Sequence, residues 1–166
     1  FENIPSRISY KGRVVVRGEA LIKYSDFDRM NREIMEVAEQ YKNPRNLCSG
    51  SVRQLNNEIT AKRHVNFFVY NLIQTDDETV YEKKEQLLWL KKLGFDIVPY
   101  EKVRQETLTG AVDRFSQLVG KGDLPSDGLV LTFDDIAYSQ SLGRTAKFPR
   151  DSIAFKWKDE LAETTL

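Results

Sequence analysis

Strand-like segments alternate with helical segments along this chain, and that interleaving constrains its fold more than any other feature. β-branched and aromatic residues dominate segments 13–24, 65–73, 128–133 and 152–157, which predicts four strands, and residues 95–100 are expected to be extended. Several links between these strands lack the pattern of a crossover helix. The sequence therefore predicts an α+β fold with mainly antiparallel sheets flanked by helices, not a doubly wound parallel sheet.

Apolar residues at helical spacing predict three longer helices and one helical turn in the remaining sequence. These are expected over residues 26–41, 80–93, 106–119 and 52–55. Ser25 or Asp26 has a side chain that can cap a helix N-terminus, and Gly94 is typical of a helix C-terminal stop. Residues 44–50 contain Pro, Asn, Ser and Gly, and we expect a loop there, with Cys48 as a small loop residue.

Length and charge limit the kinds of protein this chain can be. Its 166 residues fit one domain, and 25 Lys+Arg balance 25 Asp+Glu. A net charge of zero differs from the basic composition of many nucleic-acid binders, but it allows a basic stripe on one face. With Cys48 as its one cysteine, the chain can form neither an internal disulfide nor a Cys-based zinc site, which favours the cytoplasm. No apolar run reaches the roughly 18 residues of a membrane span.

Two charged residues interrupt otherwise apolar strand segments. Glu19 follows Gly18, a residue without a side chain that lets a ligand or another backbone approach closely. A carboxylate there can accept hydrogen bonds from a ribose, or it can face solvent and pair with Arg17 or Lys23. Lys156 can contact a phosphate as a point charge, or it can lie on the solvated face of its strand. The residues alone leave both alternatives open.

Basic and aromatic residues gather in the middle of the chain. Arg45 and Arg53 lie in a polar segment whose guanidinium and amide groups could bind phosphate, although a solvated loop has the same composition. The aromatic strand that ends at Tyr70 could stack on a base, although aromatic residues in strands more often belong to the core. His64 is expected to be structural or on the surface. The Asp-Gly pair at 127–128 indicates a turn.

Nine short motifs, taken together and in order, resemble the adenylation domain of bacterial NAD+-dependent DNA ligases. They include Arg-Gly-Glu, Asn-Pro-Arg-Asn, Phe-Phe-Val-Tyr and Asp-Gly-Leu-Val sequences. The nine matching segments are 16–19, 43–46, 50–55, 59–63, 67–70, 93–95, 127–130, 142–147 and 153–157. The resemblance extends over almost the whole chain, so residues 1–166 are expected to be part of one nucleotidyltransferase core.

The resemblance implies an enzyme that joins nicks in duplex DNA in three steps, with NAD+ as the AMP donor. A lysine takes AMP from NAD+, the AMP passes to the 5′-phosphate at the nick, and the 3′-hydroxyl displaces it. Glu19 would bind the ribose and Tyr70 would stack on adenine. Lys156 would be the catalytic contact to the α-phosphate, and Asp127 and Gly128 would begin the strand that lines the nucleotide pocket.

The resemblance also implies contacts to phosphate and DNA, and it reveals one internal departure from the family pattern. Arg45, Arg53, Lys147 and Arg150 would address phosphates of the leaving nucleotide or of the nicked strand. Thr132 occupies a nucleotide-binding position where the family usually has lysine. Losing that cation is expected to weaken nucleotide binding by on the order of 1–2 kcal/mol.

The nucleophile of the family lies in a Lys-x-Asp-Gly motif, and the printed sequence contains no such motif. The resemblance places it upstream of Phe1, so we expect an N-terminally truncated piece of a longer ligase. Such a piece alone is expected to be inactive, with the remaining ligase domains in the parent chain. Exposed sheet edges would follow, with a tendency to associate or a marginal stability.

Other classes of function stay open at this point. An ATP-dependent ligase or capping enzyme is disfavoured because the Asn-Pro-Arg-Asn and Phe-Phe-Val-Tyr motifs resemble the NAD+ branch. A non-catalytic nucleic-acid-binding domain derived from the ligase fold is the alternative, supported by Thr132 and by the missing motif. Mg²⁺ is expected for the full reaction, although the sequence has no dedicated metal cage. The expected location is the bacterial cytoplasm, without membrane attachment.

Overall fold

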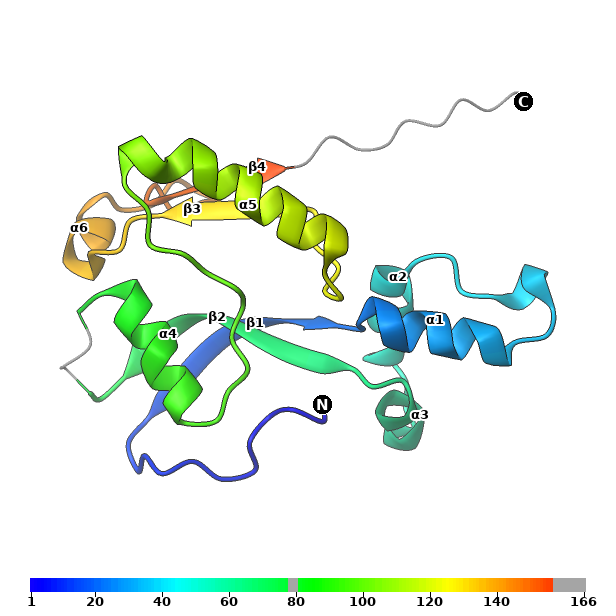
Figure 1. The fold of residues 1–166 in the computed structure, drawn as a ribbon. Helices are drawn as coiled ribbons and strands as arrows, with labels where there is room; N and C mark the ends of the chain where they lie inside the picture. The colour runs from blue at the N-terminus through cyan, green and yellow to red at the C-terminus, as the bar shows by residue number, and fades with distance from the viewer. Residues whose placement is uncertain (78–80, 157–166) are drawn as a thin grey trace.

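Two small antiparallel sheets with helices around them make up this protein, as a computed structural model that describes residues 1–77 and 81–156 shows (Figure 1). The strands are β1 (Val14–Leu21), β2 (Asn66–Thr75), β3 (Gly128–Thr132) and β4 (Ser152–Lys156). The helices are α1 (Tyr24–Glu33), α2 (Pro44–Ser51), α3 (Asn57–Lys62), α4 (Lys83–Lys92), α5 (Leu108–Lys121) and α6 (Ile136–Ser141), with short 3-10 helices at Val37–Glu39 and Gln105–Thr107. The predicted α+β fold is confirmed.

The first sheet pairs β1 with β2, and its register depends on a glycine. Glu19 lies opposite Phe68, and the register shifts between Arg17 and Gly18. A Cβ on Gly18 would lie 2.4 Å from the carbonyl oxygen of Phe68. Because a side chain cannot fit in that space, the close backbone approach predicted at Gly18 is present, and the approaching backbone is that of β2.

The buried core belongs to this first sheet and to the helices next to it. Ile22, Leu47, Cys48 and Val65 form one apolar cluster beside α1 and α2. Helix α4 lies against the sheet in Figure 1, and its Leu90 packs on β2 in a second cluster completed by Val69 and Leu72. Burying side chains of this size contributes about 1.5–3 kcal/mol each. These two clusters hold β1, β2, α2 and α4 in place.

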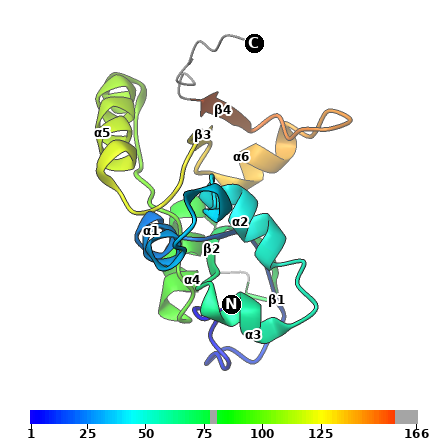
Figure 2. The same ribbon diagram turned by 90° about the vertical axis from the view of Figure 1, so that its right-hand side faces the viewer.

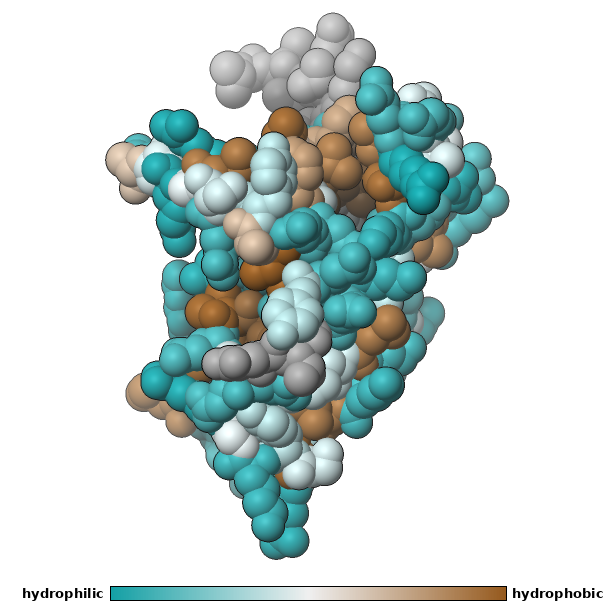
Figure 3. Space-filling view, turned by 90° about the vertical axis from the view of Figure 1, so that its left-hand side faces the viewer, coloured by the Kyte–Doolittle hydropathy of each residue, from teal (hydrophilic) through white to brown (hydrophobic). Residues whose placement is uncertain are grey.

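The second sheet pairs β3 with β4 over five residues and is less well covered. Gly128 lies opposite Lys156 at one end, and Thr132 lies opposite Ser152 at the other. Large apolar residues of this sheet are exposed, among them Val130 and Ile153. Figure 3 shows apolar surface in the upper half of the molecule, where β3 and β4 lie. Both strands are edge strands, because a sheet of two strands has no central one.

The helix expected over residues 26–41 is shorter than predicted. Helix α1 ends at Glu33, and Ile34 is already extended. The Asn31 side chain explains this end: its Nδ2 donates to the carbonyl oxygen of Tyr41 over 2.8 Å, and its Oδ1 accepts from the backbone N–H of Tyr41 over 2.8 Å. These two bonds turn the chain back on itself, which a continuous helix does not allow.

The loop expected over residues 44–50 is wrong, because those residues form α2. The Asn43 side chain accepts hydrogen bonds from the backbone amides of Arg45 and Asn46, and Pro44 occupies the first helical turn. Asn followed by Pro is a favourable start of a helix, and the sequence contained this signal. Cys48 is therefore a buried helical residue of the core and not a loop residue.

Further differences concern short elements and boundaries. The helical turn expected over residues 52–55 is a non-helical turn after α2, and the helices α3 and α6 were not predicted. Asn56 and Asp135 cap them, each through a side-chain oxygen that accepts from a backbone amide. A helix of six residues is too short to show a clear helical spacing of apolar residues. The capping residues were therefore the only features of the sequence that could have indicated α3 and α6.

The other elements agree with the sequence to within a few residues. Helices α4 and α5 lie where helices over 80–93 and 106–119 were predicted, and the four predicted strands are present. Gly94 has a φ of 95° and ends α4, as expected of a glycine stop. Residue 80, at the start of the predicted helix, and residue 157, at the end of the last strand, lie outside the described residues.

Candidate functional site

Four charged residues from four separate segments converge between the two sheets, and we call them the Arg45 cluster. Arg45 of α2 donates through Nη1 to Oδ2 of Asp127 over 2.9 Å, and its Nη2 lies 3.7 Å from Oε1 of Glu19 on β1. Lys156 lies opposite Gly128, the residue after Asp127, and acts electrostatically on the Asp127 carboxylate. The cluster therefore joins residues 19, 45, 127 and 156, which are far apart in the sequence.

Local backbone features place these side chains. The Asn43 cap starts α2 and so directs Arg45 toward the sheets. A Cβ on Gly128 would lie 2.2 Å from the carbonyl oxygen of Phe155, so glycine lets β3 and β4 pair closely beside Asp127. The cap of α2 and the close pairing at Gly128 therefore place Arg45 and Asp127 at the cluster.

Tyr70 lies on β2 close to the register shift of the first sheet. Glu19 is opposite Phe68, and Tyr70 is two residues beyond Phe68 on the same strand. The register pairs Gly18 with Val69 and Arg17 with Asn71, so Tyr70 is the bulged residue of β2. Its side chain is 46% exposed, which leaves the ring free to take a stacking partner.

The electrostatics of the cluster favour ionised, exchangeable groups. The hydrogen bond from Arg45 lowers the pKa of Asp127 below its usual value despite partial burial, and Lys156 lowers it further. The Asp127 hydrogen bond in turn raises the pKa of Arg45. The side chains of Glu19, Arg45 and Asp127 remain about three-fifths exposed. Exposed ion pairs contribute only about 0–1 kcal/mol, so an anionic ligand can displace these carboxylates from Arg45.

The buried thiol of Cys48 is also affected by the charge of Glu19. Burial raises the pKa of its thiol, and the Glu19 carboxylate raises it further. A thiol held neutral in this way is a poor nucleophile. Cys48 therefore acts as a core residue under the site.

Thr132 lies at the other end of the second sheet from Lys156. Its hydroxyl donates to the carbonyl oxygen of Asp151 over 3.2 Å and accepts from the Ser152 hydroxyl over 3.1 Å. Thr132 lies four positions along β3 from Gly128, which corresponds to about 14 Å. The structure therefore brings Glu19, Asp127, Gly128 and Lys156 together and leaves Thr132 in a separate hydrogen-bond network.

The remaining predicted phosphate contacts lie outside the Arg45 cluster. Arg53 is exposed in the turn after α2. Lys147 and Arg150 are exposed in the loop between α6 and β4, which leaves the sheet at the Ser152 end and projects away from it (Figure 2). A DNA duplex is long enough to reach several such positions at once. Their roles stay predictions.

Sequence reasoning missed one polar network, at the end of the second sheet that is remote from Lys156. Lys83 pairs with Asp151 over 3.3 Å, and Lys102 pairs with Asp134 over 2.6 Å. The members are 68 and 32 positions apart, and no motif links such distant residues. His64 likewise has an acidic partner that the sequence did not indicate, Glu2 at 2.8 Å.

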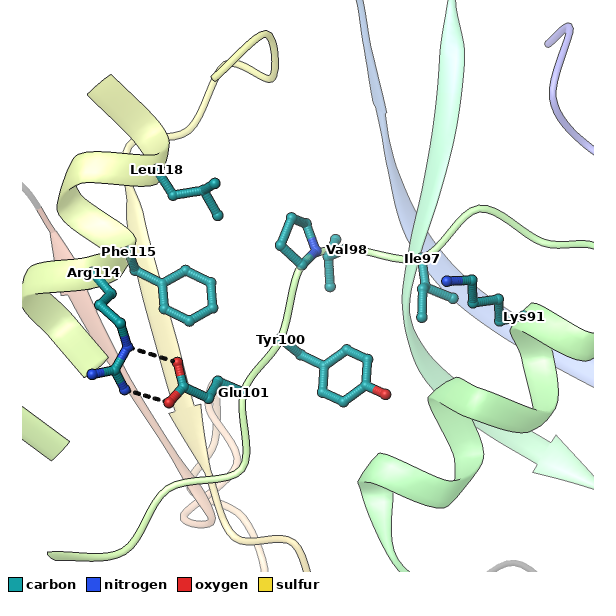
Figure 4. Close-up of a pocket in the computed structure, with 9 residues that line it drawn as sticks. Lys91, Ile97, Val98, Tyr100, Glu101, Arg114, Phe115 and Leu118 are labelled. Carbon is teal, nitrogen blue, oxygen red and sulfur yellow. Dashed lines mark hydrogen bonds and ion pairs between the residues drawn. The ribbon is translucent and has the colours of Figure 1, made fainter. Parts of the chain in front are cut away.

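A groove of about 500 Å³ runs between α5 and the segment after α4, away from the Arg45 cluster. Figure 4 shows Phe115 and Leu118 of α5 on one side of it and Val98 on the other. The guanidinium of Arg114 pairs with Glu101 at its rim. This groove combines a largely apolar lining with the Arg114–Glu101 ion pair and the ammonium group of Lys91, and none of the predicted site residues lines it.

Within residues 1–77 and 81–156 no three His, Cys, Asp or Glu side chains are placed to hold a metal ion together. Among the helices of the same ranges, none has the length and apolar character needed to cross a membrane.

The α+β core with two antiparallel sheets and a charged cluster between them agrees with the nucleotidyltransferase class. Residues 1–160 match the family of NAD-dependent DNA ligase adenylation domains. The chain belongs to this family.

Curated relatives support the same assignment. The chain is 57% identical to a DNA ligase of Ruminiclostridium cellulolyticum and 55% identical to one of Lachnoclostridium phytofermentans, in both cases over 100% of its length. It is 36% identical to a DNA ligase of Bacillus cereus strain AH187 over 98% of its length. These matches cover 25%, 26% and 25% of the three relatives, so the chain spans about a quarter of their length.

Proposed function

We propose that this chain is part of a DNA ligase that takes AMP from NAD+ and seals nicks between a 3′-hydroxyl and a 5′-phosphate in duplex DNA. The observation that carries the proposal is the Arg45 cluster. It provides two cations beside two displaceable carboxylates, in a chain of the adenylation family. Such an arrangement suits a ligand that combines a ribose with phosphates. The parent protein would act in replication and repair in the bacterial cytoplasm.

The exposed face of the first sheet would hold the adenosine half of NAD+. Tyr70 offers a half-exposed ring for adenine, worth about 1–3 kcal/mol per stacked base. Glu19, which lies opposite Phe68 in the register, offers a carboxylate that can accept hydrogen bonds from ribose hydroxyls. Asp127 and Gly128 would close the pocket from the second sheet. Thr132 would contact the nucleotide only if the ligand extends along β3.

The cations of the cluster would act on the phosphates. In AMP transfer a lysine nitrogen attacks the α-phosphorus, the bond to the nicotinamide mononucleotide oxygen breaks, and a phosphoramidate forms. Lys156 would neutralise negative charge on the α-phosphate as this happens. Arg45 would exchange its carboxylate partners for a phosphate, because a bidentate guanidinium–phosphate contact is stronger than an exposed ion pair.

The other substrates and partners follow from the same proposal. Arg53, Lys147 and Arg150 would contact the DNA backbone, and the salt dependence of DNA binding would measure how many of them do so. Mg²⁺ would be held mainly by phosphate oxygens, as is usual for this ion. The attacking lysine belongs to a Lys-x-Asp-Gly motif that the printed sequence lacks, so the 166 residues alone are expected not to form lysyl-AMP.

The test is AMP transfer to the full-length protein that contains this chain. Intact mass after incubation with NAD+ and Mg²⁺, or with ATP and Mg²⁺, reports covalent AMP, and a labelled nicked duplex reports sealing. We expect AMP from NAD+ and not from ATP, and its loss in Lys156→Ala but not in the control Lys92→Ala on α4. No AMP from either donor, combined with tight binding of nicked DNA, would establish the non-catalytic nucleic-acid-binding alternative instead.

A further inference from the structure

The second sheet is attached to the rest of the molecule at its remote end by a set of ion pairs, which we call the far-end latch. Lys102 Nζ lies 2.6 Å from Oδ2 of Asp134 and 2.9 Å from Oε2 of Glu82. Lys83 Nζ lies 3.3 Å from Oδ2 of Asp151. Glu82 and Lys83 stand at the start of α4, while Asp134 and Asp151 flank β3 and β4. The latch therefore ties α4 to both strands of the second sheet.

Asp134 contacts the start of α4 through several groups. Besides its ion pair, its Oδ1 accepts from the backbone amide of Lys84 over 2.9 Å. Its carbonyl oxygen accepts from the amide of Lys83 over 2.8 Å, and the Ile136 amide donates to the carbonyl oxygen of Tyr81 over 3.2 Å. One residue thus joins the start of α4 through both its backbone and its side chain.

Apolar packing does not fix the second sheet in the same way. Neither buried apolar cluster found in residues 1–77 and 81–156 includes a residue of β3 or β4. The sheet is held at its near end by the exposed Arg45–Asp127 pair and at its remote end by the far-end latch. The chain before β3 is also tied to α1, because Asp123 accepts hydrogen bonds from Tyr24 and Ser25. Of the two charged attachments the latch is the more buried, because the Asp151 side chain is 12% exposed and the Asp127 side chain 58%.

The two attachments lie at opposite ends of the second sheet, whose strands are short. Thr132 and Ser152 pair at the latch end, and Gly128 and Lys156 pair at the cluster end. The strands between them span about 14 Å, so a tilt of about 4° at the latch moves Lys156 by about 1 Å. A displacement of about 1 Å of a reacting group can slow an enzyme by about 100-fold.

We propose that Asp134 is a positioning residue for AMP transfer: it anchors β3 and β4 on the start of α4 and thereby sets the place of Lys156 beside Asp127. The inference rests on the function proposed above. Asp134 acts through Lys156 and does not touch the nucleotide, since it lies two residues beyond the end of β3 that is remote from Lys156.

The first measurement needs no ligase activity, so it separates this inference from the proposed function. Nitroxide labels on Gln74→Cys in β2 and Ala154→Cys in β4, both exposed positions, report the distance between the two sheets. Cys48 stays unlabelled because it is buried, and the chain without added cysteines checks this. We expect a narrow distance distribution, which Asp134→Ala broadens or shifts. Asp134→Asn keeps the acceptor for the Lys84 amide and should retain most of the narrow distribution.

Controls address general destabilisation. Asp113→Ala removes an exposed carboxylate of α5, outside the latch, and should leave the distance distribution unchanged. If Asp134→Ala does not fold, the pair Lys83→Met and Lys102→Met removes both ammonium groups of the latch and leaves its backbone bonds. A distribution that stays narrow and unshifted in whichever variant folds would overturn the inference.

The second measurement is AMP transfer in the full-length ligase. Asp134→Ala should slow single-turnover transfer from saturating NAD+ by about 10-fold or more, while half-saturating NAD+ changes by less than about 3-fold. Asp134→Asn should recover most of the rate. A broadened distance distribution with an unchanged rate overturns the positioning role. A wild-type protein that takes no AMP from NAD+ contradicts the proposed function, whereas the distance result would still stand.

Discussion

Gly18 lies where β1 and β2 approach each other most closely, and its replacement tests that contact directly. A Cβ there would lie 2.4 Å from the carbonyl oxygen of Phe68 and 2.7 Å from the ring of Phe67. Because the carbonyl oxygen belongs to the sheet backbone, it cannot move away without breaking the register. We expect Gly18→Ala to lower the free energy of unfolding by about 1–3 kcal/mol, measured by urea titration. Gly120→Ala is the matched control: it lies in α5 with nothing within 4 Å and should stabilise by about 0.5–1 kcal/mol.

Asp151 makes the stability of the chain depend on pH. Burial would raise its pKa, but the Ser152 hydroxyl and the Lys83 ammonium outweigh burial and hold the pKa below the ordinary value of 3.8. A carboxyl whose pKa is lower in the folded than in the unfolded state stabilises the fold above the unfolded pKa, and this stabilisation is lost as pH falls through the folded pKa. The unfolding free energy should therefore fall as pH drops from about 5 to below 3.8, and Asp151→Asn should make that fall shallower.

The control for this prediction is the same pH series on a carboxylate outside the latch. Urea titrations of the wild type, Asp151→Asn and Asp113→Asn at matched pH values cancel the contributions of the other titrating groups. Asp113→Asn should follow the wild type. An equally steep fall in Asp151→Asn would show that the Lys83 pair does not contribute.

At the scale of elements, α2 connects the core to the site through its cap. Leu47 and Cys48 of this helix are buried, and Arg45 of its first turn contacts the two carboxylates of the cluster. Asn43 accepts from the amides of the first turn, and such a cap contributes about 1 kcal/mol. Asn43→Ala should therefore lower the unfolding free energy by about that amount, whereas Asn43→Asp, which retains the acceptor, should not. Equal losses in both variants would mean that the cap is not the cause.

The same element shows what the sequence predicts well and what it does not. The long periodic segments that became α4 and α5 and the β-branched segments that became the strands were predictable from pattern. α2 was not, because Pro, Asn, Ser and Gly indicate a loop on average, and the cap at Asn43 decides otherwise. At the site, the position of Glu19 in its strand was foreseen, but its proximity to Arg45 depends on how the helix packs. The far-end latch depends on pairs too remote in sequence to be seen.

At the scale of the whole molecule, the two sheets differ in how completely they are covered. The first has α4 on one face and a buried core, whereas the second exposes Val130 and Ile153, each about 70% accessible. Unpaired strand edges beside exposed apolar residues are a template for association with another chain. This agrees physically with the sequence-based expectation of an association-prone or marginally stable chain, and it assigns that tendency to the β3–β4 surface.

We therefore expect the chain to sediment as a monomer when dilute and to form larger species as its concentration rises. Val130→Lys places a charge on the exposed surface of β3 and should suppress this association without a large loss of stability, because Val130 is 70% exposed. Met35→Lys is the matched control, since Met35 is 99% exposed and lies outside both sheets. Sedimentation velocity over a range of concentrations measures the effect. A chain that stays monomeric at all concentrations would contradict this prediction. Equal suppression of association by Met35→Lys and Val130→Lys would show that the second sheet is not the association surface.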